Sequence, residues 1–266
     1  MEQQSPVLLR EEQGEVLWLT LNRPDQLNAL NPPLITALRE AFESLRRNHD
    51  IRVVVLRGNG RAFCAGLDLN DASWSDAPTA HDILDFQRSI SDIYRAMRQC
   101  PQPIIGLVHG AACGGGFSLA LASDIRIAAE SAKMNAAYIK AGLTACDMAC
   151  SYLLPRLVGL SVASELMLTG RFINAERALR VSLVSDVVAE DQLEGAANAL
   201  IQELLETSPM GLRLTKDGLN MAVDAGSIEA AMALEDRQQA LAAMTRDAQE
   251  AVTAFLEKRK PVWRDR

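Results

Sequence analysis

An uncharged, glycine-rich segment in the middle of the chain restricts the possible folds more than any other feature. From Gln99 to Ser123 there is no Asp, Glu, Lys or Arg, and a segment of that length could span a bilayer. The same segment contains five glycines, two prolines and a histidine. Such a composition favours a buried strand, a tight turn and a helix over a membrane helix. We therefore expect a globular protein without a membrane partner.

The rest of the N-terminal part alternates between apolar runs and amphipathic patterns. Val16–Leu21 is a β-branched and leucine-rich run, whereas apolar residues recur at helical spacing between Leu34 and Leu45. Strands that alternate with helices are typical of an α/β fold with parallel pairing. The predicted strands are 16–21, 51–56, 104–108, 124–128 and 184–188, and the predicted helices are 33–48 and 83–97.

The pattern changes near residue 190. Residues 190–258 have helical periodicity almost throughout, with breaks at Ser208-Pro209 and Gly226-Ser227. We expect an α/β core over residues 1–190 and a helical region over residues 191–266, which would be either a packed cap or an oligomerisation module.

Composition excludes several classes of function. The formal net charge of −7 argues against a surface for nucleic acid or anionic membranes. The five cysteines form no CxxC pair, so we expect neither a zinc site nor a disulfide framework. The first residues lack a basic stretch followed by an apolar core, and we therefore expect a cytoplasmic protein without a signal peptide.

The turn at 109–124 is the strongest candidate for a functional site. A strand enters it, Gly114, Gly115 and Gly116 turn the chain, and an apolar helix leaves. The first N–H groups of that helix lack internal partners and could stabilise a negative charge, although tight packing alone would also explain the glycines. A hydrolase nucleophile at Ser118 is excluded, because its histidine should follow it and all three histidines (49, 81 and 109) precede it.

Five segments, in order and at family-like spacing, resemble the crotonase (enoyl-CoA hydratase/isomerase) family. They are LNRPDQLNAL (21–30), RAFCAGLDL (61–69), HGAACGGGFSLALASDIRIA (109–128), LPRLVG (154–159) and FLEKRKPVW (255–263). The resemblance implies a crotonase-like spiral of ββα units with a C-terminal helical trimerisation region. It also implies an acyl-CoA thioester as substrate, no cofactor or metal beyond the coenzyme A of that substrate, and a homotrimer or dimer of trimers.

The resemblance further implies roles for individual residues. The backbone N–H groups of Leu67 and Gly115 would hold the thioester oxygen and stabilise an enolate. Positions similar to the family's coenzyme A contacts are Arg23, Ala29, Ala62, Ala65, Lys258, Arg259 and Lys260. The last three fit a solvated helix end equally well.

At two positions the chain departs from the family's hydratases. Ser118 and Tyr138 stand where those enzymes place glutamates that activate water. Because hydroxyls of ordinary pKa cannot replace two carboxylates, we expect isomerase or lyase chemistry rather than hydration. The alternative is a non-catalytic acyl-CoA binding protein.

Asp147 is the lone charge between Ala141 and Pro155. It could cap a helix that begins near Ser151, since Asp is a favoured capping residue. Its position also resembles that of a functional aspartate in dienoyl-CoA isomerases and 4-chlorobenzoyl-CoA dehalogenases, with a register that is uncertain by one residue. We list it as the candidate acid/base and keep the cap as the alternative.

Overall fold

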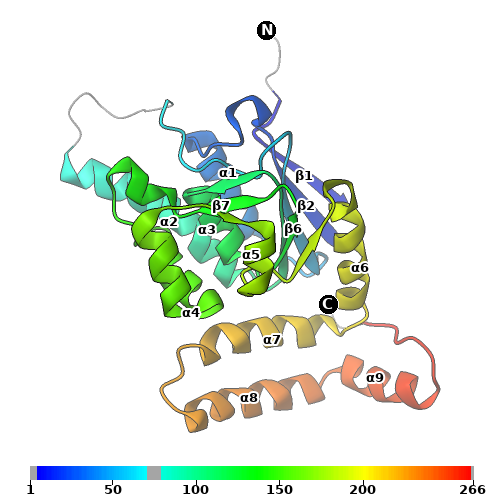
Figure 1. Cartoon of the computed structure of the whole chain (residues 1–266). Helices are drawn as coiled ribbons and strands as arrows, with labels where there is room; N and C mark the ends of the chain where they lie inside the picture. The colour runs from blue at the N-terminus through cyan, green and yellow to red at the C-terminus, as the bar shows by residue number, and fades with distance from the viewer. Residues whose placement is uncertain (1–4, 71–78, 265–266) are drawn as a thin grey trace.

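The architecture comes from a computed structural model, which describes residues 5–70 and 79–264. Two layers of helices enclose a twisted sheet, and a group of C-terminal helices lies below it (Figure 1). The strands are β1 (Leu8–Gln13), β2 (Val16–Leu21), β3 (Val53–Gly58), β4 (Ile104–Val108), β5 (Ala111–Cys113), β6 (Ile125–Ala129), β7 (Lys133–Asn135), β8 (Ile173–Asn174) and β9 (Asp186–Val188). The α-helices are α1 (Pro32–Leu45), α2 (Ala80–Gln99), α3 (Gly115–Ala122), α4 (Cys150–Thr169), α5 (Ala175–Arg180), α6 (Leu193–Leu205), α7 (Pro209–Ala222), α8 (Ile228–Ala243) and α9 (Arg246–Leu256).

The larger sheet has the order β1-β2-β3-β4-β6-β9. β1 and β2 form an antiparallel hairpin, and the remaining neighbours pair in parallel. A parallel sheet needs helices on its faces, and β2, β3 and β4 are almost entirely buried as a result.

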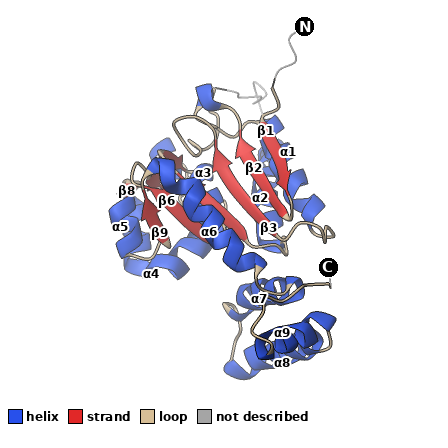
Figure 2. Cartoon of the chain, turned by 90° about the vertical axis from the view of Figure 1, so that its right-hand side faces the viewer, coloured by secondary structure: helices blue, strands red, loops and turns tan. Residues whose placement is uncertain are grey.

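Side-chain alternation assigns the two faces of this sheet. Leu17, Leu19 and Leu21 of β2 face a large core shared with α1, α2, α3 and α4. Val16 and Trp18 of the same strand face the other side, where α6 covers them with Leu193, Ala197 and Ile201. Figure 2 shows α6 crossing this second face of the sheet.

A small sheet of order β5-β7-β8 extends from the end of β4. β5 and β7 pair in parallel, with Cys113 opposite Asn135. Because β5 leads directly into α3, this second sheet holds the glycine-rich turn in place.

Helices α7, α8 and α9 lie beyond the sheet as a separate layer (Figures 1 and 2). α8 has no buried residue within this chain. Large apolar side chains are accordingly exposed on these helices, among them Leu219, Met221, Ile228, Met232, Leu241, Met244, Phe255 and Leu256. The predicted boundary at residue 190 between an α/β core and a helical region stays a prediction. In the structure, α6 packs on the sheet, whereas α7–α9 extend away from it.

The predicted elements are found with small shifts. The strand predicted at 51–56 is β3, which begins two residues later, and the helix predicted to end at residue 48 ends at Leu45. The breaks at Ser208-Pro209 and Gly226-Ser227 separate α6 from α7 and α7 from α8. A further break, before Thr245, was not predicted because neither Gly nor Pro marks it.

Candidate active site

Main-chain hydrogen bonds join the loop after β3 to the loop after β4. Phe63 N–H donates to the His109 carbonyl (2.9 Å) and Cys64 N–H donates to the Ala111 carbonyl (3.0 Å). In the opposite direction, Cys113 N–H donates to the Cys64 carbonyl (3.0 Å). The two glycine-bearing loops that the sequence singled out are therefore in direct contact.

Two glycines permit this close approach. A Cβ atom added to Gly116 would lie 2.1 Å from the Cys64 carbonyl oxygen, which no side chain could tolerate. A Cβ atom added to Gly66 would lie 2.8 Å from the Cys113 carbonyl oxygen and 3.6 Å from the Gly115 nitrogen. Gly66 also has a φ of 99°, a region that favours glycine.

The N-terminus of α3 has no side-chain cap. Its N-cap residue is Gly114, with φ 48°, which offers no side-chain acceptor. Within residues 5–70 and 79–264, neither Gly115 N–H nor Leu67 N–H donates a hydrogen bond. Both donors remain available for an acceptor that the protein does not itself supply.

Ser118 and Tyr138 meet each other directly behind this turn. Their hydroxyl oxygens are 2.6 Å apart, and the Tyr138 hydroxyl donates to the Gly114 carbonyl at 2.6 Å. Both side chains are buried. Burial raises the pKa of Tyr138 well above its ordinary value, so the pair stays neutral.

Asp147 lies in the turn before α4 and is half-buried. Its Oδ1 atom accepts hydrogen bonds from Gln87 Nε2 on α2 (2.5 Å) and from Met148 N–H (2.7 Å). Burial raises the pKa of Asp147, although these two hydrogen bonds oppose the shift. Both bonds end on Oδ1, and neither occupies Oδ2.

The cap interpretation of Asp147 receives no support from this geometry. The N-cap residue of α4 is Ala149, and no side chain caps the helix. Met148 and Ala149 have positive φ values of 46° and 63°, which are strained for residues with a Cβ atom. This turn places Met148 Sδ 3.2 Å from the Tyr94 hydroxyl, which in turn donates to the Gly115 carbonyl (2.9 Å). The Asp147 turn and the α3 turn are therefore connected.

Sequence reasoning missed Gln87 and Tyr94. Both are on α2, and each reaches a partner that is remote in sequence. Neither belongs to a recognisable motif, so only the spacing of the apolar residues of α2 was informative.

Two of the cysteines near the site, Cys64 and Cys150, are buried. Burial raises the pKa of Cys64 to about 12 and that of Cys150 to about 12. A thiolate mechanism at these positions is therefore unfavourable.

The predicted coenzyme A positions in the N-terminal part cluster in one place. Arg23 donates to the Ala29 carbonyl and forms an ion pair with Asp68 (2.9 Å). Asn28 Nδ2 binds the Ala62 carbonyl (2.8 Å), and Ala65 N–H donates to the Leu27 carbonyl (2.9 Å). The Arg23 guanidinium thus stabilises the loop before α1.

The basic cluster at the C-terminus lies elsewhere in this chain. Arg259 pairs with Glu250 and Glu257, and Lys260 pairs with Glu206 at 2.5 Å. Glu250 lies in α9, Glu257 directly follows α9, and Glu206 directly follows α6. Lys258 has φ 55° at the end of α9. Within the described part of the chain, no hydrogen bond or ion pair joins these three residues to the glycine loops.

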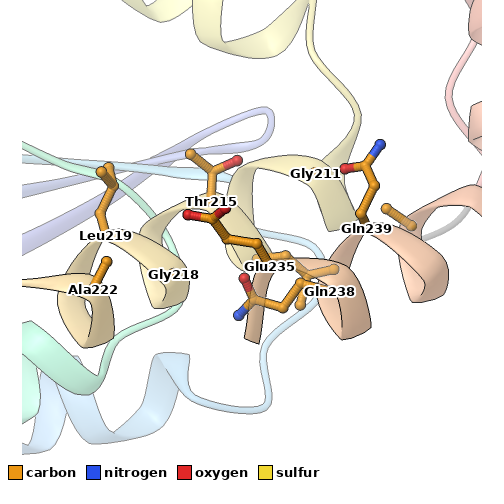
Figure 3. A pocket seen from close by; sticks show the side chains of 10 residues that line it. Gly211, Thr215, Gly218, Leu219, Ala222, Glu235, Gln238 and Gln239 are labelled. Carbon is orange, nitrogen blue, oxygen red and sulfur yellow. The ribbon is translucent and has the colours of Figure 1, made fainter. Parts of the chain in front are cut away.

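A separate pocket lies between α7 and α8, with a volume of about 290 Å³ (Figure 3). Its lining includes Leu219, Thr215, Glu235 and Gln238, and none of the predicted site residues contributes to it.

Among the described residues, no helix has the length and apolar character needed to cross a membrane.

The chain therefore combines a mostly parallel sheet with two glycine-bearing loops that main-chain hydrogen bonds hold together. The profile of the Enoyl-CoA hydratase/isomerase family matches residues 11–266. The chain belongs to this family.

The names of similar proteins describe more than one activity. A "probable enoyl-CoA hydratase" of Mycobacterium bovis is 40% identical over 98% of this chain and 93% of its own length. The 1,2-epoxyphenylacetyl-CoA isomerase of Escherichia coli is 38% identical over 96% of this chain and 97% of its own length. The crystal structure of an enoyl-CoA hydratase from Mycobacterium smegmatis superposes with a TM-score of 0.91 at 33% identity, covering 97% of this chain and 99% of that one.

These comparisons confirm the predicted crotonase-like α/β fold and the family. Membership of the family also supports an enzyme that acts on acyl-CoA thioesters. The names of the relatives divide between hydratase and isomerase, so they leave the reaction open.

Proposed function

We propose that this protein is an acyl-CoA enzyme that works through an enolate and catalyses an isomerase or lyase reaction rather than a standard hydration. The Leu67 and Gly115 N–H groups hold the thioester carbonyl oxygen. Negative charge grows on that oxygen as a proton leaves the α-carbon, and preorganised donors stabilise it. One such donor typically contributes roughly 3–4 kcal/mol to the transition state.

The observation that carries this proposal is the arrangement around the α3 turn. The Leu67 and Gly115 N–H groups have no partner in the described chain, and Tyr94 and Met148 connect Gly115 to the turn of Asp147, a half-buried carboxylate whose pKa is raised by burial. In the proposed mechanism, Asp147 moves the proton at the acyl α-carbon. A raised pKa suits this role, because it makes the carboxylate a stronger base toward the α-proton than an ordinary aspartate is.

The hydroxyls at 118 and 138 support the choice of reaction. Hydration requires a group that deprotonates water and one that protonates the α-carbon. The neutral Ser118–Tyr138 pair offers no base for this, and Asp147 alone would have to serve both steps. We expect the protein to hydrate crotonyl-CoA at a rate well below roughly 10 s⁻¹, which is a typical enzyme rate. Hydration at or above that rate would contradict the proposed reaction class.

A panel of acyl-CoA thioesters, read by mass spectrometry, tests the function itself. We expect at least one thioester to be converted to an isomer or cleaved, and thioesters to bind far better than the matching free acids in calorimetry. Equal affinity for acid and thioester would refute the thioester site. Tight thioester binding without conversion of any panel member would favour the non-catalytic binding protein.

We also propose that α7–α9 mediate assembly into a trimer or a dimer of trimers. The exposed apolar residues on these helices support this, because a monomer rarely leaves such side chains in water together. In the assembly, Lys258, Arg259 and Lys260 would meet the phosphates of coenzyme A bound to a neighbouring subunit. Light scattering at micromolar concentration should give at least three times 29.0 kDa, and a mass of one chain would contradict the assembly.

A further inference from the structure

The peptide bond between Gly114 and Gly115 has a role at each end. Its N–H is the Gly115 donor that the proposed function assigns to the thioester oxygen. Its carbonyl, that of Gly114, accepts hydrogen bonds from the Tyr138 hydroxyl (2.6 Å) and from Ser118 N–H (2.9 Å). Groups that bind this carbonyl can therefore influence the N–H on the other side of the same peptide.

The direction of the hydrogen bonds follows from the chemistry of the groups. A carbonyl oxygen only accepts, so the bond between Tyr138 and Gly114 uses the single hydroxyl proton of Tyr138. The Tyr138 oxygen must then accept from Ser118 Oγ, which lies 2.6 Å away. The bonds form a chain that runs from Ser118 through Tyr138 to the Gly114 carbonyl.

Three properties make this chain effective. Ser118 is 0% and Tyr138 6% exposed, so water does not compete for the hydroxyls. Hydrogen bonds in series polarise one another in a medium of low dielectric constant, by roughly 10–30% per bond. A donor on the carbonyl oxygen also withdraws electron density from the peptide and makes its N–H a stronger donor.

The ring of Tyr138 also fixes the orientation of this peptide. Its Cε1 atom would lie 3.6 Å from a Cβ atom at Gly114, so the ring packs against the turn. The pKa of Tyr138 is raised well above its ordinary value by burial, and the hydroxyl therefore keeps the proton that it donates.

We propose that Ser118 and Tyr138 are positioning residues, a hydroxyl relay that orients and polarises the Gly114–Gly115 peptide and so strengthens the Gly115 N–H toward an oxyanion. The proposal rests on the proposed function, because it assumes that the thioester oxygen binds this N–H. It gives the two hydroxyls a task that does not require them to ionise or to touch the substrate.

Acetoacetyl-CoA is a suitable probe, because its enolate absorbs in the near ultraviolet and its keto form does not. At saturating ligand, the enolate-to-keto ratio reports stabilisation of the oxyanion independently of affinity and of the chemistry of turnover. We compare the wild type with Tyr138→Phe, Ser118→Ala and the double variant. Tyr152→Phe is the matched control, since Tyr152 lies on α4 and its hydroxyl binds Asp224 instead.

The relay predicts a graded and non-additive response. Tyr138→Phe should lower the enolate-to-keto ratio roughly three- to ten-fold, whereas Ser118→Ala should lower it about two-fold, because it is one bond further from the peptide. The double variant should match Tyr138→Phe alone, and Tyr152→Phe should match the wild type.

Several outcomes would overturn the relay. An unchanged ratio in a folded Tyr138→Phe variant would do so, and so would a Ser118→Ala effect that adds fully to that of Tyr138→Phe. If Tyr138→Phe does not fold, Ser118→Ala decides alone, and an unchanged ratio there refutes the relay. Wild-type protein that binds the probe without stabilising its enolate, or does not bind it, would instead contradict the proposed function and the relay with it.

Discussion

Two regions flank the Gly114–Gly115 peptide and differ in the chemistry that they bring to it. On one side, the hydroxyls of Ser118 and Tyr138 are buried, neutral and bonded to each other. On the other side, the Asp147 turn contributes a half-buried carboxylate with a raised pKa. Met148 and Tyr94 connect this second region to the Gly115 carbonyl.

The difference separates support of an oxyanion from transfer of a proton. In our proposal, the hydroxyl side supports the oxyanion donor and the Asp147 side transfers the proton. A single ionisable group is sufficient for moving a proton at one carbon, whereas activation of water needs a second. Variants that change one side at a time test whether the two tasks are separate.

The largest effect is expected from Asp147→Asn. Asparagine keeps an acceptor for Gln87 and Met148 N–H but cannot take a proton, so turnover should fall roughly 10²-fold or more. Thioester affinity should stay within a few-fold, as measured by calorimetry. Asp92→Asn is the control, because Asp92 is an aspartate of α2 that pairs with Arg95 away from the site. A variant that keeps the wild-type rate would remove Asp147 from the mechanism.

A smaller loss is expected where the two glycine loops touch. In Gly116→Ala, the new Cβ atom would lie 2.1 Å from the Cys64 carbonyl oxygen, so one loop must move. Overpacking of this kind costs roughly 1–3 kcal/mol of unfolding free energy, and thioester binding should weaken with it. The control is Gly195→Ala on α6, where nothing lies within 4 Å and stability should rise by roughly 0.5 kcal/mol. Equal melting temperatures of the two variants would show that the loop contact is not tight.

The smallest effect is expected from Gln87→Met, which removes one hydrogen bond to Asp147 and keeps the side-chain volume. That bond lowers the pKa of Asp147, so its loss should raise the pKa further. If Asp147 acts as a base, the acidic limb of the kcat/KM profile should move to higher pH, so kcat/KM should fall at pH values on that limb. Gln99→Met, at the exposed end of α2, should leave the profile unchanged. A Gln87→Met profile with an unshifted acidic limb would argue against the carboxylate as the titrating group.

The sequence was sufficient for the elements that are long and regular. Val16–Leu21 and Ile104–Val108 are buried strands, as their apolar runs predict, and the glycine-rich turn at 114–116 begins α3. β5, β7 and β8 were missed because each has only two or three residues, too few to show a period. β1 was missed because five of its six residues are exposed.

The candidate site shows the same limit. Main-chain donors could be placed from glycines, because the residue type itself reports a special backbone. The Gln87–Asp147 bond joins positions sixty residues apart, and the ion pair of Arg23 with Asp68 joins positions forty-five apart. Such pairs depend on how the helices pack, which the local sequence does not encode.

Exchange of the α-proton of an acyl-CoA in D₂O isolates the proton transfer that is assigned to Asp147. It needs no knowledge of the natural acyl group, since any bound thioester with α-hydrogens can be followed by mass spectrometry. We expect the wild type to incorporate deuterium at the α-carbon, and Asp147→Asn to do so at least roughly 10²-fold more slowly while still binding the thioester. Bound thioester without exchange in the wild type, or undiminished exchange in Asp147→Asn, would contradict this assignment.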